Sequence, residues 1–88
     1  MTAPANPAAH RRHSLLATLY FEPQGSARVG TLVRQMELVH NLVVSSDLVR
    51  ADLMWLDEVG LVRVKDDAAQ VTERGRDVAT SRAQFPGA

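Results

Sequence analysis

Apolar residues recur in the first half of the chain with the spacing of helices. The first helical pattern begins at His10 and ends before Pro23, because proline pushes the preceding residue out of the helical region. Ser26 is expected to cap the second helix, and Asn41 is expected to end it in a left-handed conformation. The apolar stripe of this second helix is regular, at i, i+3, i+4, i+7 and i+10: Val29, Leu32, Val33, Met36 and Val39.

A third helical pattern follows, with Ser45 or Ser46 as its cap and Gly60 as its stop. Successive helical residues lie ~100° apart, so the apolar residues of this helix fall on one side. Its outward face then carries a mixed set with an acidic bias: Asp47, Arg50, Ala51, Met54 and Glu58.

After the glycine, the segment "LVRVK" alternates in polarity and predicts a half-buried strand with Arg63 and Lys65 pointing outward. "DDAA" forms the tip of a hairpin, and "QV" begins the return strand. Thr72 is expected to cap a final helix, and Gly75 within that helix predicts a close packing contact. Three helices, a two-stranded hairpin and a closing helix predict an α+β, mainly α domain, the winged helix-turn-helix. The alternative is a three-helix bundle that carries a hairpin.

The length of 88 residues limits the chain to one domain. Residues 1–9 are rich in proline and alanine and predict a disordered leader, residues 10–83 form the domain, and residues 84–88 form a tail. No apolar run approaches the ~20 residues that span a bilayer, and the first residues do not read as a signal peptide. The sequence therefore predicts a soluble cytoplasmic protein without a membrane contact.

The amino-acid composition and motifs exclude several classes of function for this chain. The chain has no cysteine, which excludes disulfides, thiolate zinc sites and cysteine-based sensors. No phosphate loop and no set of catalytic residues is present, so we expect neither an enzyme nor a cofactor. His10 and His13 have a spacing that can bind metal, but no third ligand is near, and no metal site is predicted.

Two segments of the second half carry a resemblance to a known family: "VSSDLVRADLMWLDEVGLV" (44–62) and "VTERGRDVA" (71–79). Together they resemble small Mu-like phage proteins that are commonly labelled ArsR-type winged-helix transcriptional regulators. The resemblance implies a DNA-binding regulator in a bacterial host cell, and the lack of cysteine excludes cysteine-based arsenic or metal sensing. The matching positions are Val44-Ser45, Asp47, Val49-Arg50, Asp52, Trp55-Leu56, Gly60-Leu61-Val62, Thr72 and Gly75.

The winged-helix interpretation assigns candidate contacts with double-stranded DNA. Base reading needs hydrogen-bond donors on the exposed N-terminal half of the third helix, while the hairpin and the start of the second helix would contact phosphates. The predicted contact residues are Ser45, Ser46, Arg50, Met54, Arg63, Lys65 and Arg28.

Charge argues against this assignment. Ten lysines and arginines balance ten aspartates and glutamates, whereas DNA binders usually have a basic balance. Residues 45–59 hold one arginine and four acids, a net charge of −3 (1 − 4). Asp66 and Asp67 at the hairpin tip would repel phosphates, and Arg50 could instead form an i,i+3 salt bridge with Asp47.

Asp52 falls within the apolar arc of the third helix, where a carboxylate without a partner costs several kcal/mol. We therefore predict a salt bridge to Arg11, Arg12 or His13 in the first helix. The final helix has too few apolar residues to form a core alone, so the first and last helices are expected to form a homodimer surface. Trp55 is expected in the core or at a dimer contact.

Two functions follow from these observations. The favoured one is a small phage-type DNA-binding regulator of transcription. The alternative is an adaptor that uses its acidic third helix to bind a phage or host protein. The discriminating feature is Arg50, which DNA reading requires to be free, whereas the adaptor expects Met54, Asp47 and Glu58 at the contact.

Overall fold

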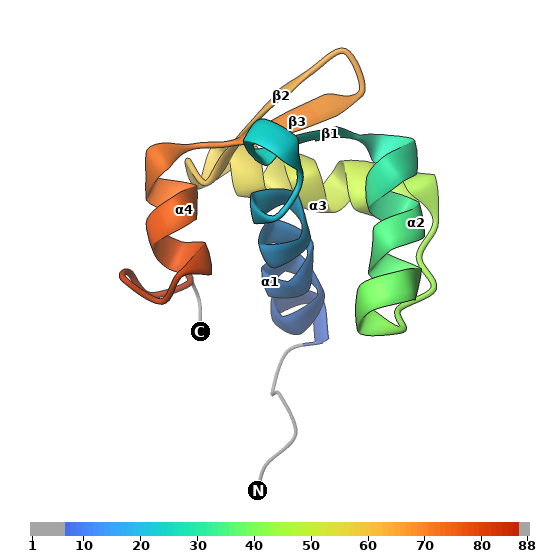
Figure 1. The fold of residues 1–88 in the computed structure, drawn as a ribbon, viewed down its shortest axis with the longest axis horizontal. Helices are drawn as coiled ribbons and strands as arrows, with labels where there is room; N and C mark the ends of the chain where they lie inside the picture. The colour runs from blue at the N-terminus through green and yellow to red at the C-terminus, as the bar shows by residue number, and fades with distance from the viewer. Residues whose placement is uncertain (1–6, 87–88) are drawn as a thin grey trace, which may run out of the picture.

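The computed structural model describes residues 7–86. In this range the chain is α+β and mainly helical, with four α-helices and a three-stranded antiparallel sheet (Figure 1). This composition is compatible with the predicted winged helix-turn-helix. The elements in chain order are α1 (Pro7–Tyr20), the 3-10 helix η1 (Pro23–Gly25), β1 (Ser26–Arg28), α2 (Val29–His40), α3 (Ser46–Glu58), β2 (Val62–Lys65), β3 (Ala68–Val71) and α4 (Glu73–Ala79).

Helix α1 is the centre of the fold. In Figure 1 it lies between α4 and α2, α3 crosses behind it, and the sheet closes the upper end. The periodic apolar residues of the helices meet in one core. Val39 is an exception, because the predicted stripe of α2 places it with the core, whereas 64% of the residue is exposed. The residues at the centre of the core are Leu15, Leu16, Leu19, Leu32, Met36, Leu53 and Leu56.

The first helix begins earlier than the sequence pattern indicates. It starts at Pro7 rather than His10, because proline has no N–H to leave unpaired and its fixed φ suits a first helical turn. The predicted leader of residues 1–9 therefore overlaps α1 by three residues, and its first six residues lie outside the described range.

The region between α1 and α2 contains a strand that the sequence did not predict. Ser26–Arg28 form β1, which pairs antiparallel with β3, so the sheet has three strands in the order β1-β3-β2. Arg28 rather than Ser26 is therefore the N-cap residue of α2. The return strand β3 also begins at Ala68, two residues before the predicted start at Gln70.

The ends of the later helices follow the predicted rules. The Ser45 hydroxyl accepts a hydrogen bond from the Leu48 N–H at 3.0 Å, and Thr72 caps α4 in the same way. Asn41 ends α2 in the left-handed region, with φ 55°. A side chain at Gly75 would place its Cβ 2.0 Å from the carbonyl oxygen of Leu61, which confirms the predicted close contact.

The predicted bridge of Asp52 is also present. Only 2% of this α3 residue is exposed, and its carboxylate accepts hydrogen bonds from the guanidinium groups of Arg11 and Arg12 on α1. The distances are 2.5 Å to Arg11 Nε, 2.9 Å to the terminal nitrogen of Arg11 and 3.0 Å to Arg12 Nε. The hydrogen bond to Asp52 raises the pKa of Arg11. This ion pair fixes α1 against α3.

The predicted tail of residues 84–88 contains a core residue. Phe85 is 7% exposed, stacks on Trp55 with ring centroids 5.8 Å apart, and meets the edge of His13 at 5.2 Å. Val78 of α4 is also buried within the single chain. The apolar residues of α4 are therefore covered without a partner, which removes the physical reason for placing a dimer surface on α1 and α4.

Candidate nucleic-acid interface

The outer surface of the sheet carries one kind of charge. Alternate strand residues point to opposite faces, and the register aligns Ser26 with Gln70 and Arg63 in one row and Arg28 with Ala68 and Lys65 in the next. The exposed residues of the described strands are all cationic or neutral, and we refer to them as the sheet face: Ser26, Arg28, Arg63, Lys65 and Gln70.

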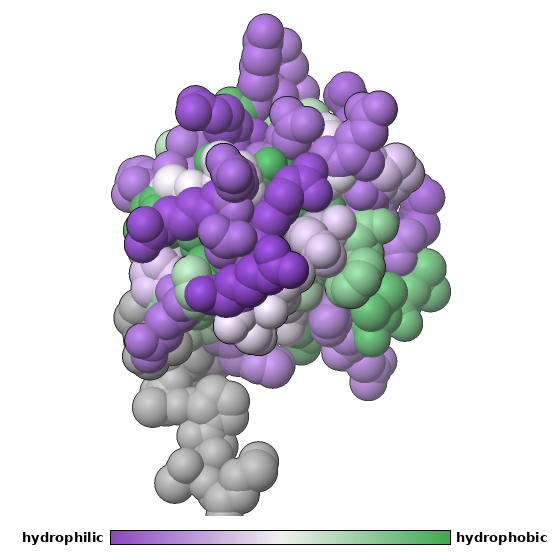
Figure 2. Space-filling model, turned by 60° about the vertical axis from the view of Figure 1, so that its left-hand side comes forward, coloured by the Kyte–Doolittle hydropathy of each residue, from purple (hydrophilic) through white to green (hydrophobic). Residues whose placement is uncertain are grey.

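The cations of the sheet face have no salt-bridge partner in the described part of the chain. Arg28 acts only at longer range, where its charge contributes to lowering the pKa of Asp67. Figure 2 shows the hydrophilic side chains that cover the upper part of the molecule, where the sheet lies. Arg28, Arg63 and Lys65 therefore present a net charge of +3 to solvent.

The tip of the hairpin is held against both α2 and α3. Asp66 and Asp67 have positive φ values of 51° and 60°, the conformation of a tight two-residue hairpin turn. The Asp67 carbonyl accepts a hydrogen bond from the Val29 N–H at 3.0 Å. Its carboxylate accepts two from Arg50 on α3, at 2.7 and 3.0 Å. Arg50 also donates to Asp47 at 3.1 Å, the bridge that the sequence raised as an alternative.

The Arg50–Asp67 pair changes the electrostatics of α3. Hydrogen bonds from Arg50 lower the pKa of Asp67, and Asp67 in turn raises the pKa of Arg50. Both side chains remain nearly half exposed, so the pair contributes little to stability. A DNA base or phosphate would nevertheless have to displace two carboxylates to reach this guanidinium. Arg50 is not free in this structure.

The remaining predicted contacts on α3 are also poorly suited to base reading. The Ser45 hydroxyl oxygen accepts the helix-capping hydrogen bond, Ser46 is half-buried, and Met54 is exposed without a hydrogen-bond donor. The exposed face of α3 carries a net charge of −2 (1 − 3), and its residues are Asp47, Arg50, Ala51, Met54, Asp57 and Glu58.

Helix α3 also holds the first strand of the hairpin, β2. The Asp57 carboxylate accepts a hydrogen bond from the Val64 N–H of β2 at 2.9 Å. Together with the Arg50–Asp67 pair at the tip, this bond fixes the hairpin to α3 at two points along its length. The sequence did not indicate either contact, because each depends on how the hairpin folds back against α3.

The predicted site residues thus separate into two surfaces of opposite charge. Arg28, Arg63 and Lys65 come together on the sheet face, and the α3 residues form an acidic surface with one paired arginine. Within residues 7–86, no group of three or more histidine, aspartate or glutamate side chains could hold a metal ion. No helix in that range is long and apolar enough to cross a membrane.

Comparison with known proteins assigns the chain to no family. No protein-family model matches the chain, and comparisons with curated proteins and with solved structures found no match. The resemblance to Mu-like phage regulators therefore stays a prediction.

Proposed function

We propose that this chain is a winged helix-turn-helix protein that binds double-stranded DNA through its phosphates, with the sheet face as the contact surface. The observation that supports the proposal is the exposure of Arg28, Arg63 and Lys65 on one face that lacks carboxylates in the described strands. Arg63 and Lys65 alternate along β2, at a spacing similar to that of successive phosphates along a strand.

Contacts of this kind hold DNA without reading its sequence, because phosphates are the same at every base pair. In the base-reading part of the predicted site, Arg50 is paired with Asp67 at 2.7 Å. We therefore infer weak discrimination between duplex sequences. Neutralising three phosphates gives a salt slope of about −2.7, so affinity should fall roughly 40-fold between ~50 and ~200 mM salt.

The experiment is a fluorescence-anisotropy titration of a labelled random duplex at several salt concentrations. Arg63→Ala should reduce the salt slope by about 1, because one phosphate contact is lost. Arg82→Ala is the matched control, since it removes one exposed charge beyond α4. Ala51→Tyr adds neutral bulk to the exposed face of α3 and should leave binding unchanged.

Three outcomes contradict the proposal. These are no binding at low salt, an equal loss for Arg63→Ala and Arg82→Ala, and loss of binding for Ala51→Tyr. The last result would indicate that DNA contacts α3, as the base-reading interpretation requires.

A second candidate function is the protein-binding adaptor, and the Arg50 geometry is the observation that favours it. With Arg50 paired, the exposed face of α3 combines net negative charge with Met54, which is 61% exposed. Such a face suits a basic, partly apolar surface on a phage or host protein. If DNA binding is absent and a captured partner is lost with Met54→Glu but retained with Arg63→Ala, the adaptor replaces the DNA-binding proposal.

A further inference from the structure

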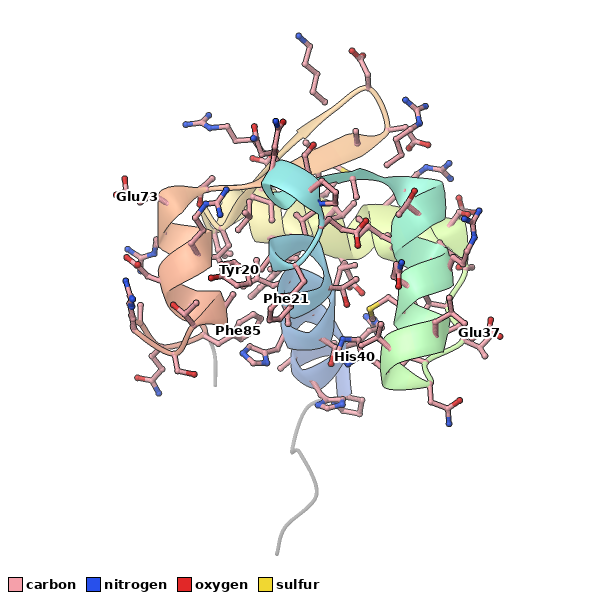
Figure 3. The ribbon with its side chains drawn as sticks, in the orientation of Figure 1. Tyr20, Phe21, Glu37, His40, Glu73 and Phe85 are labelled. Carbon is pink, nitrogen blue, oxygen red and sulfur yellow. The ribbon has the colours of Figure 1, made fainter. Side chains whose placement is uncertain are left out.

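An apolar groove runs between the end of α1 and the side of α2, and neither the acidic nor the cationic surface uses it. Its volume is about 340 Å³, and its lining includes Ala17, Phe21, Gln35 and Val39. Figure 3 shows Phe21 over α1 and His40 at the end of α2, beside the boundary between these helices. Apolar side chains also gather at the right-hand edge of the view in Figure 2.

The apolar residues here are large and poorly covered. Phe21 is 81% exposed, Val39 64%, and Leu38, the residue before Val39 on α2, 72%. Each Å² of apolar surface in water costs about 25 cal/mol relative to burial. A cluster of large apolar side chains on a small protein is typical of an interaction surface.

The charges at the two margins identify the occupant. Glu22 lines the groove on the α1 side. On α2, helical geometry places Arg34 ~40° from Leu38, on the side away from Val39. Across the surface, the order is therefore an acid, an apolar centre and a base, with the exposed Glu37 ~60° beyond Arg34 on α2. When the two-fold axis runs between the two margins, each margin faces the opposite margin of the partner, which pairs Glu22 with the partner's Arg34.

We propose that this α1–α2 groove is the interface at which two copies of the chain associate about a two-fold axis. In that arrangement Phe21 and Val39 pack against the partner's Leu38, and two Glu22–Arg34 pairs close the margins. The surface differs from the α1 and α4 faces that the sequence predicted. The inference does not rest on DNA binding.

The size of the surface sets the expected affinity. Stable interfaces bury ~800 Å² on each partner, and a contact centred on three large side chains lies at the small end of this range. We expect a dimer that dissociates in the micromolar range, so its population should rise with protein concentration between ~1 and ~500 µM.

Sedimentation equilibrium over this concentration range tests the inference. The full chain should pass from the mass of one chain to the mass of two. Val39→Glu should raise the dissociation constant at least tenfold, since it buries a carboxylate in the apolar centre. Val43→Glu is the matched control, because Val43 is 82% exposed but does not line the groove.

A charge exchange tests the two-fold arrangement itself. Glu22→Arg and Arg34→Glu should each weaken the dimer, because each places like charges opposite one another, and the double variant should restore it. The inference is overturned if the mass is that of one chain at every concentration. It is also overturned if Val39→Glu and Val43→Glu weaken the dimer equally, or if the double variant forms no tighter a dimer than the single variants. The duplex titration is performed at protein concentrations below the dissociation constant of the dimer. DNA binding and dimer formation are then tested separately.

Discussion

Asp52 is the position where a single substitution should have the clearest effect on folding. Its carboxylate is 98% removed from solvent and accepts three hydrogen bonds from Arg11 and Arg12. Asp52→Ala removes the acceptor and leaves both guanidinium groups without a carboxylate at the junction of α1 and α3. It also leaves a space in the core that the smaller side chain cannot fill.

The size of the effect follows from the exposure of the arginines. Removing one partner of a fully buried pair costs ~3–5 kcal/mol, because the remaining charge is buried without compensation. The Arg11 and Arg12 side chains are 23% and 24% exposed, so they can turn partly toward water. We therefore expect a loss of ~2–3 kcal/mol. At 4–8 °C for each kcal/mol in a domain of about this size, the Tm should fall by roughly 10–20 °C.

The assay is thermal unfolding followed by far-ultraviolet circular dichroism. Glu58→Ala is the matched control, since Glu58 is an exposed carboxylate on the same helix and its loss should change stability by less than ~0.5 kcal/mol. A Tm for Asp52→Ala within ~3 °C of the parent would contradict this expectation. So would a decrease of equal size for Glu58→Ala, because it would show that burial and pairing are not the cause.

Two further predictions concern the C-terminal segment and the hairpin tip. Phe85→Ala should lower the free energy of unfolding by ~2–3 kcal/mol in chemical denaturation, because a buried ring on Trp55 is lost; an unchanged midpoint would contradict this. Hydrogen bonds from Arg50 lower the pKa of Asp67 from its usual 3.8, so the pair stabilises the fold above that pH and is lost as pH falls through the lowered value. The small Tm difference between the parent and Asp67→Asn should therefore shrink as the pH falls below 3.8, and a difference that stays constant from neutral pH into acid would disprove the assignment.

Much of the helical framework is predictable because it depends on neighbouring residues. The apolar spacing of α2 and the caps at Ser45 and Thr72 are local signals. The Asp52 bridge was predictable for a different reason. A carboxylate on the apolar side of a helix is costly to bury without a cation, and the first helix supplies arginines at a suitable position.

The features that the sequence did not reveal depend on contacts between distant segments. The strand β1 has three residues and no alternation long enough to recognise, and it forms because β3 offers it hydrogen bonds. Phe85 looks like part of a polar tail until Trp55 provides a surface for its ring. The Arg50–Asp67 pair requires a turn with two positive φ values, which aspartate adopts less readily than asparagine or glycine.

The total charge of the chain hides its distribution. A net charge of zero argues against DNA binding only if the charges are mixed evenly. Strand pleating instead collects Arg28, Arg63 and Lys65 on the sheet face, while helical spacing collects carboxylates on α3. A local field can therefore attract phosphates to one surface and repel them from the other.

The packing around Trp55 gives the molecule a built-in optical reporter. Trp55 is the single tryptophan of the chain. The Arg12 guanidinium lies 4.5 Å from its ring, and Phe85 stacks on it from the other end of the chain. Tryptophan emission therefore responds to the docking of both α1 and the C-terminal segment without any attached dye. A spectral change that precedes the loss of helix would reveal that these end segments open before the rest of the fold.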